Sequence, residues 1–312
     1  MSLSRAARRH APAVRLEPDV EPAQADLHTH TSRSDGLLEP VALAAAARAA
    51  GVRLLAITDH DTLAAYRELR GSPALPPDLE LVAGVEINTV SSGDGSTPGE
   101  EIHVLGFGLD ADDARLEEAL ASQREHRAGR FQAMLARLRT LGLGVDEALE
   151  AAPGAMGGVE SLGRPTVARA MVRLGHASSV EDAFDRWLSR GRPAYVPRDG
   201  LDPLGAIRTI RQAGGIPVLA HYPEALHAPA VVRELAEAGL GGLESYYRTF
   251  DRDTAASMAR LAGSMGLLAT GGTDYHGDLG PYANAHAELW FPVAAGATVG
   301  ARLRDATTEV VG

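Results

Sequence analysis

The chain has 312 residues, no cysteine and a formal net charge of -11, with 45% hydrophobic and 23% charged residues. This composition is that of an ordinary soluble globular protein with a substantial core. The negative charge argues against broad electrostatic attraction to nucleic acid or anionic membranes. The absence of cysteine excludes disulfides, thiolate metal ligands and a cysteine nucleophile.

The first 22 residues contain Arg5, Arg8 and Arg9 but no apolar stretch of the kind found in signal peptides. No apolar run in the sequence approaches membrane-spanning length. We therefore expect residues 1–22 to be a flexible tail. We expect a cytoplasmic protein with no membrane partner and no stable protein partner.

Residues 23–110 alternate between strand-like and helix-like patterns. Segment 41–50 is rich in alanine, follows Pro40 and ends before Gly51, as helices commonly do. Further along we expect a strand at 53–58, a helix at 63–70 and strands at 80–86 and 101–108, the last two flanking a polar loop at 91–100. This alternation is typical of α/β proteins.

Helical patterns dominate from residue 111 to residue 190. Segment 112–141 is expected to form one long amphipathic helix or two, and shorter helices are expected at 164–174 and 180–189. Strands and helices then alternate again at 206–213, 216–221, 231–238, 241–246, 254–265 and 267–271, before a final strand at 287–291. We predict an α/β barrel made of residues 23–110 and 191–312, with residues 111–190 inserted as a helical cap.

Histidines and acidic residues recur at the ends of the predicted strands. His28 and His30 are two residues apart, so on an extended strand both side chains leave the same face. Similar positions after or within apolar runs hold Asp35, His60, Glu86, His103, His221, Asp274 and His276. Burying so many polar groups without partners is costly, so a shared metal cluster is favoured. Imidazole and carboxylate ligands suit Mn, Fe or Zn.

These segments resemble the PHP (polymerase and histidinol phosphatase) family of metal-dependent phosphoesterases. The resemblance rests on residues 26–30 with Asp35–Gly36, and on 57–61, 84–86, 102–106, 220–221 and 272–276. It is strongest to the branch that acts on nucleotides and RNA 5′ ends, including 3′,5′-bisphosphate nucleotidases. That branch implies a distorted (β/α)7 TIM-like barrel with a helical insertion.

The resemblance also implies nine metal ligands: His28, His30, Asp35, His60, Glu86, His103, His221, Asp274 and His276. Family members hold three ions in such a set, whereas the sequence alone leaves two or three divalent ions (Mn, Fe or Zn) open. Clustered cations activate a bridging water, so we expect phosphoester hydrolysis by a metal-bridging hydroxide. The catalytic candidates are His221, His276 and Asp274, and a metal-bound water could equally protonate the leaving group.

The substrate also needs cationic contacts, because a phosphate is dianionic. Arg164 and Arg192 each lie between glycine and proline, and we predict that both contact phosphate. Arg127 and Arg130 are further candidates for phosphate contact, but a solvated helix face is favoured for both. The expected substrate is a small phosphorylated molecule such as a nucleotide, extending to the 5′ end of a short single-stranded RNA.

Several residues near the site receive other predictions. Asp59 and Asp61 are expected to orient His60, although Asp61 could equally cap the next helix. Glu244 is expected to support the ligands from behind. Rim packing is favoured for Tyr246, Tyr247 and Tyr275, and no ligand role is expected for His10, His126, His176, His227 and His286. The residues Tyr222–Pro223 depart from the family, which usually has proline directly after the histidine, and this bears on substrate preference.

Three alternatives stay open. Histidinol-phosphate phosphatases share the ligand pattern, and a non-catalytic metal-binding or proofreading-accessory module is a second possibility. A metal-dependent amidohydrolase is a third, but such sites generally use a carbamylated lysine, and no lysine lies in the motif segments.

Overall fold

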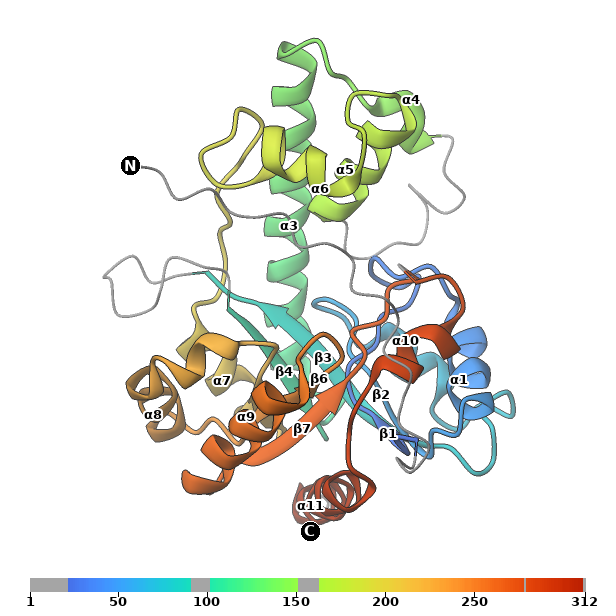
Figure 1. Ribbon diagram of the computed structural model, residues 1–312, viewed down its shortest axis with the longest axis vertical. Coiled ribbons are helices and arrows are strands. Elements are labelled where there is room, and N and C mark those ends of the chain that lie inside the picture. The colour runs from blue at the N-terminus through green and yellow to red at the C-terminus, as the bar shows by residue number, and fades with distance from the viewer. Residues whose placement is uncertain (1–21, 91–101, 151–162, 278, 311–312) are drawn as a thin grey trace.

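The computed structural model describes residues 22–90, 102–150, 163–277 and 279–310. The predicted tail, apart from residue 22, and the predicted loop at 91–100 lie outside the described residues. Seven strands form one sheet that rolls into a nearly closed barrel, and a group of helices stands above one end of it (Figure 1). The strands are β1 (Ala25–Asp26), β2 (Leu54–Ile57), β3 (Glu80–Asn88), β4 (His103–Phe107), β5 (Ile216–Leu219), β6 (Gly242–Tyr247) and β7 (Leu268–Gly272).

Neighbouring strands follow one another in chain order around the barrel. All pairs are parallel except those made by β4, which runs antiparallel to both β3 and β5. The barrel closes where the chain beyond β1 meets the end of β7, since Leu27 N donates to Gly271 O (3.0 Å) and Asp274 N donates to His28 O (2.7 Å). The predicted distorted TIM-like barrel is therefore confirmed.

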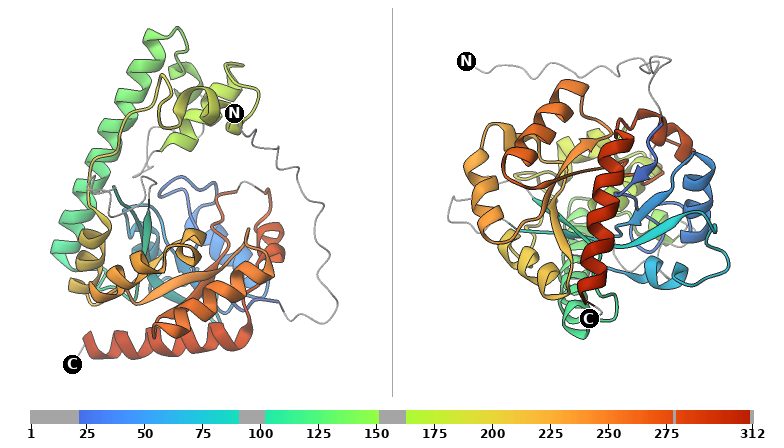
Figure 2. Two further views of the ribbon diagram at one scale, coloured as in Figure 1. Left: turned by 60° about the vertical axis from the view of Figure 1, so that its left-hand side comes forward. Right: turned by 90° about the horizontal axis from the view of Figure 1, so that it is seen from below.

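The helices of the barrel lie on its outside, as expected for βα units. They are α1 (Pro40–Ala49), α2 (Ala64–Leu69), α7 (Pro203–Gln212), α8 (Pro229–Glu237), α9 (Arg252–Ser264), α10 (Tyr282–Glu288) and α11 (Val293–Val310), with a 3-10 turn η2 (Pro223–Leu226). Helix α11 crosses the end of the barrel opposite the cap (Figure 2). Among the described helices, none combines the length and apolar character needed to cross a membrane.

The helices above the barrel are α3 (Ala114–Thr140), α4 (Asp146–Glu150), α5 (Arg164–Arg173) and α6 (Val180–Ala183), followed by a π-helical turn η1 (Phe184–Leu188). Segment 112–141 thus forms one long helix. Asp113 begins it by accepting hydrogen bonds from Arg115 N and Leu116 N. Leu116 and Leu120 pack in the barrel core, whereas Phe131 and Leu138 belong to a separate core between α3, α4 and α5. The separate core supports a cap domain, and its boundaries at 111 and 190 stay a prediction.

The final strand predicted at 287–291 is wrong. Residues up to Glu288 continue helix α10, and residues 289–291 pair with no described strand. Leu289 and Phe291 are buried at 4% and 3% exposure while Trp290 is less buried, so the segment imitates the alternation of a strand. The contact between the ends of β1 and β7 already closes the barrel and leaves no edge for an eighth strand.

Candidate active site

The barrel mouth below the cap brings the nine predicted metal ligands together. His28 and His30 follow β1, His60 follows β2, His221 follows β5, and Asp274 and His276 follow β7. In a parallel barrel these carboxyl ends meet at one rim. His103 begins β4, and because β4 is antiparallel its first residue reaches the same rim, opposite Asn88 at the end of β3. This orientation explains why His103 lies within its apolar run while the other histidines follow theirs.

Glu86 lies at the centre of the cluster. Its Oε2 is 2.9 Å from His60 Nδ1 and 3.3 Å from His30 Nε2, and its Oε1 is 2.8 Å from His103 Nδ1 and 3.4 Å from His221 Nε2. One carboxylate thus contacts histidines from four strand ends. A carboxylate with two differently surrounded oxygens is able to serve two cations at once.

In two pairs of histidines, the ring nitrogens lie unusually close to each other. His28 Nε2 lies 3.1 Å from His30 Nε2, and His103 Nδ1 lies 3.2 Å from His221 Nε2. Asp274 Oδ1 is 3.2 Å from both nitrogens of the first pair. Ligand atoms around one ion are separated by roughly 3.0–3.4 Å when metal–nitrogen distances are about 2.1 Å. The spacing therefore fits shared metal ligands.

Within the described residues, three groups have the spacing to hold a metal ion. They are His30, Asp35, His60 and His276; His28, His30 and Glu86; and Glu86, His103 and His221. One atom in these groups, His30 Nδ1, is buried and has no hydrogen-bond partner among the described residues. Buried polar atoms are normally satisfied, and a bound metal ion would satisfy this nitrogen.

The protonation states of the clustered side chains also favour a metal-binding site. Burial alone would raise the pKa of Glu86, yet the surrounding imidazoles hold it well below its ordinary value. Burial would likewise lower the pKa of His276, but the carboxylates of Asp35 and Asp274 outweigh that effect and raise it to about 10. Burial dominates for His60 and lowers its pKa to about 4. The carboxylates are therefore ionised and require positive charge beside them, which divalent cations would supply in place of protons.

Buried hydrogen bonds fix the ligand strands from behind. Glu244 Oε1 accepts from His28 Nδ1 (2.9 Å) and its Oε2 accepts from His221 N (2.7 Å), so one carboxylate holds two ligands, as the sequence led us to expect. Such partners orient ligands and raise their basicity. Asp26 accepts from Thr273 and from the hydroxyl of Tyr282 (2.6 Å), which ties β1 to the segment that carries Asp274.

The backbone at the site is strained at three non-glycine residues. Asp61, His221 and Asp274 have φ values of 57°, 28° and 49°, in the left-handed region that side chains rarely adopt. Strain of this kind persists only where the surrounding structure enforces it, and it is concentrated at functional sites. Each of the three residues is a predicted ligand or the neighbour of one.

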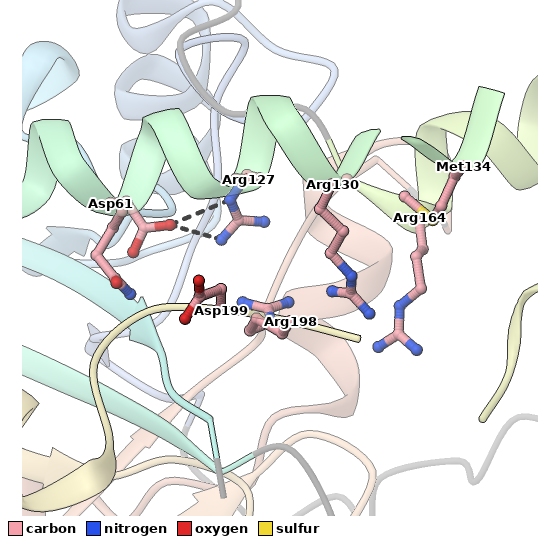
Figure 3. A pocket seen from close by; sticks show the side chains of 9 residues that line it. Asp61, Arg127, Arg130, Met134, Arg164, Arg198 and Asp199 are labelled. Carbon is pink, nitrogen blue, oxygen red and sulfur yellow. Dashed lines mark hydrogen bonds and ion pairs between the residues drawn. The ribbon is translucent and has the colours of Figure 1, made fainter. Parts of the chain in front are cut away.

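A pocket lined by four arginines adjoins the ligand cluster. Arg127 and Arg130 come from α3, Arg164 begins α5, and Arg198 comes from the segment that returns to the barrel (Figure 3). A Cβ placed on Gly163 would lie 3.6 Å from Arg127 Nη1 and 3.9 Å from Asp35 Oδ2. Gly163 therefore lies between the pocket and the predicted metal ligand Asp35.

Each side of the arginine pocket is held by specific contacts. Asp61 Oδ2 accepts from Arg127 Nε (3.1 Å) and Nη2 (2.7 Å). Arg130 Nε donates to Val196 O (2.9 Å), and the Arg164 guanidinium lies over the Phe184 ring at 5.6 Å. Arginine forks held in this way suit phosphate.

Comparisons with known proteins agree with this geometry. The model of the PHP domain matches residues 26–136. The chain is 36% identical over 279 residues to the 5′-3′ exoribonuclease Rnm of Escherichia coli, covering 86% of this chain and 89% of that protein. The chain belongs to the PHP family. It is therefore a metal-dependent phosphoesterase, and the family predicted from the motifs is confirmed.

Two further proteins are similar to this PHP chain. The 3′,5′-nucleoside bisphosphate phosphatase of Chromobacterium violaceum is 30% identical over 258 residues, covering 81% of this chain and 87% of that protein. The crystal structure of a proposed metal-dependent phosphoesterase from Bifidobacterium adolescentis has a TM-score of 0.70 and 30% identity, and the match covers 82% of this chain and 90% of that one.

Two predictions about the PHP site are wrong. Arg127 and Arg130 do not form a solvated face: they are 9% and 8% exposed and line the pocket. Asp59 and Asp61 do not contact the His60 ring among the described interactions. Asp59 instead accepts from Thr31 and Ser34, which braces the loop before Asp35, and Asp61 pairs with Arg127.

Asp61 is not a helix cap either. The residue before α2 is Leu63, which makes no side-chain cap, and the Thr62 hydroxyl accepts from Ala64 N instead. The left-handed backbone at Asp61 turns its carboxylate toward α3, where Arg127 is the partner.

The two arginines predicted as phosphate contacts lie in different places. Arg164 lines the pocket, whereas Arg192 is exposed and does not line it. Contact of either residue with substrate stays a prediction. Arg198 was missed, since no motif surrounds it.

The structure also places the tyrosines and the remaining histidines for which predictions were made. Tyr246 and Tyr275 are buried in rim packing, as expected. Tyr247 is different, because its hydroxyl donates to Asp274 Oδ2 (2.9 Å) and burial together with that carboxylate holds its pKa well above the ordinary value. None of His126, His176, His227 and His286 belongs to a described ligand group, and His10 lies outside the described residues.

Proposed function

We propose that the protein hydrolyses a phosphate ester of nucleotides that carry a second phosphate, such as 3′,5′-bisphosphate nucleotides. The observation that carries this is the arginine pocket beside the ligand cluster. The two anion-attracting sites are separated by little more than Gly163. A substrate with two phosphates could occupy both sites at once.

The same observation argues against histidinol phosphate. That molecule has one phosphate and an amine, and the pocket lining, with four guanidinium groups against the carboxylates of Asp61 and Asp199, has a net positive charge that disfavours the amine. A non-catalytic role is also disfavoured, because the nine predicted ligands converge at the barrel mouth. The sequence contains no lysine, which argues against an amidohydrolase of the carbamylated type.

The residues of the cluster would hold two or three divalent ions, of which we favour three, one for each ligand group, drawn from Mn, Fe or Zn. Such ions supply positive charge to the transferring phosphoryl group and activate water. Glu244 holds His28 and His221 in place, and the Tyr247 hydroxyl keeps its proton on Oη while donating to Asp274. Catalytic proton transfer by His221, His276 or Asp274 stays a prediction, as does the cytoplasmic location.

The test is a substrate panel. The chain is stripped with chelator, reloaded with Mn, Zn or Fe, and given adenosine 3′,5′-bisphosphate, 3′-AMP, 5′-AMP and histidinol phosphate while phosphate release is measured. We expect the highest kcat/KM for the bisphosphate. We expect Arg164→Met to raise KM for the bisphosphate about tenfold, the effect of losing one charge-assisted hydrogen bond, with little effect on 3′-AMP.

The matched control is Arg260→Met, because Arg260 is exposed on α9 and does not line the pocket. It should leave all four substrates unchanged. A higher kcat/KM for histidinol phosphate than for the bisphosphate in wild type would overturn the proposal.

A further inference from the structure

Strand β6 is irregular where it reaches the ligand cluster. Glu244 pairs with Thr270 of β7, and the next pair joins Tyr246 to Gly271. Ser245 is an extra residue between these two pairs. Such a β-bulge changes the direction of the side chains that follow it and is common beside active sites. The usual alternation of side chains along β6 is therefore shifted by one residue after Ser245.

The bulge decides which tyrosine of β6 faces the cluster. In a regular strand, Glu244 and Tyr247 would leave opposite faces, because they are three residues apart. With the bulge, their partners on β7 are Thr270 and Gly272, which are two residues apart and therefore share a face. Tyr247 thus lies on the same side of the sheet as Glu244, which supports the ligands, and Tyr246 faces the other side.

The hydroxyl of Tyr247 contacts one oxygen of a predicted metal ligand. It donates a hydrogen bond to Asp274 Oδ2 (2.9 Å). The other oxygen of that carboxylate, Oδ1, lies 3.2 Å from the Nε2 atoms of both His28 and His30. The two oxygens therefore have different surroundings: Tyr247 holds Oδ2, whereas Oδ1 is directed toward the neighbouring predicted ligands.

Asp274 requires more support than the other carboxylates of the cluster. Its φ of 49° is in the left-handed region, a conformation that persists only where neighbouring groups enforce it. Its side chain is 18% exposed, whereas those of Glu86 and Asp35 are 1% and 2% exposed, so packing constrains it less. The hydrogen bond from Tyr247 supplies a constraint from outside the set of predicted ligands.

We propose that Tyr247 is a positioning residue for metal binding, whose hydroxyl fixes the Asp274 carboxylate so that Oδ1 is presented beside His28 and His30. The proposal rests on the proposed role of Asp274 as a metal ligand. Hydrogen-bond partners of ligands typically change metal affinity 10–100-fold. The alternative role is direct contact with substrate, because Tyr247 and His221 both line a cavity next to the cluster. The two roles differ in which binding equilibrium they affect.

The test is a metal titration of Tyr247→Phe, which keeps the ring and its edge-to-face contact with Phe250 but removes the hydroxyl. In competition with a chelator, we expect Mn to bind this variant about tenfold more weakly than wild type. At saturating Mn, KM for adenosine 3′,5′-bisphosphate should be unchanged, because no contact with substrate is lost. The matched control is Tyr246→Phe, on the same strand but on its other face, where the ring packs on Phe291. Its Mn affinity should equal that of wild type.

A double variant shows whether the effect of Tyr247 passes through Asp274. Asp274→Asn should itself weaken Mn binding, and Tyr247→Phe should cause no further loss in that background, because residues that act through one another are not additive. The proposal would be overturned by unchanged Mn affinity in Tyr247→Phe, with or without a higher KM. It would equally be overturned by a tenfold loss that persists in the Asp274→Asn background, as expected for a purely structural role. Both results leave the proposed function intact, since phosphate release from the bisphosphate by the wild-type enzyme tests that function separately.

Discussion

The ion pair between Asp61 and Arg127 gives the most direct test of how the cap is joined to the metal site. Asp61 follows the ligand His60, and its carboxylate accepts two hydrogen bonds from Arg127 of α3. Both side chains are nearly inaccessible to solvent, at 2% and 8% exposure. Asp61→Asn keeps the shape of the side chain but removes the charge, and it leaves Arg127 beside three other arginines without its partner.

The expected loss of stability is large for a single substitution. Removing one partner of a buried pair costs about 3–5 kcal/mol, because the other charge stays buried without compensation. Arg127 borders an open pocket, so we expect the lower end, about 3 kcal/mol. At about 2 °C per kcal/mol for a chain of this size, Tm should fall by about 6 °C.

The assay is thermal unfolding of the Mn-loaded protein, followed by circular dichroism. The double variant Asp61→Asn/Arg127→Met should be more stable than Asp61→Asn alone, because it removes the uncompensated guanidinium. The control is Asp112→Asn, which breaks an exposed pair with Arg70 and should cost less than about 1 kcal/mol. The reasoning would be refuted if Asp61→Asn lowered Tm by less than 2 °C. It would also be refuted if the Tm decreases of the two single variants added up in the double variant.

Two further predictions concern the metal cluster. Glu244→Gln should weaken metal affinity about 10–100-fold, because it disturbs His28 and His221 together. The control Glu288→Gln changes an exposed residue and should leave the affinity unchanged. Metal titration with a competing chelator measures both affinities. Without metal, the pKa of His276 is about 10 when folded and about 6.5 when unfolded, so its stabilising effect is complete below pH 6.5 and is lost as pH rises toward 10. The Tm measured with chelator should therefore fall between pH 6.5 and 9, while the Mn-loaded protein should not show this loss; equal slopes would contradict the exchange of protons for metal.

Repetition of one pattern in the sequence predicted the cluster of histidines and carboxylates that the structure brings together. Predicted ligands such as His60 and His221 follow apolar strands, and strands that close a barrel must deliver such residues to one rim. His103 was identified as a candidate from its residue type. Its position within the apolar run could not be explained from the sequence, because nothing in the segment shows that β4 is antiparallel. Direction in a sheet depends on pairing partners that lie far away in the chain.

The sequence analysis predicted the arginine pocket less well, although the spacing of its residues on α3 contained a signal. Gln123, Arg127, Arg130 and Met134 all line the pocket, and their spacing places them on one face of α3. A charged helix face usually meets solvent, so the helical pattern alone favoured the wrong conclusion. Whether such a face is covered depends on α5 and the returning segment, which only the tertiary structure brings to it.

The division of the site between barrel and cap has a consequence for specificity. The predicted metal ligands come from strand ends of the barrel, whereas Arg127 and Arg164 come from the cap helices α3 and α5. A relative could keep the ligands and change the cap, and it would then keep the hydrolytic chemistry but bind a different second group. The ion pair between Asp61 and Arg127 is one of the direct bonds between these two parts, and it is the one that joins a neighbour of a predicted ligand to a residue of the pocket. Loss of that pair should therefore reduce selection between bisphosphate and monophosphate more than it reduces turnover of 3′-AMP.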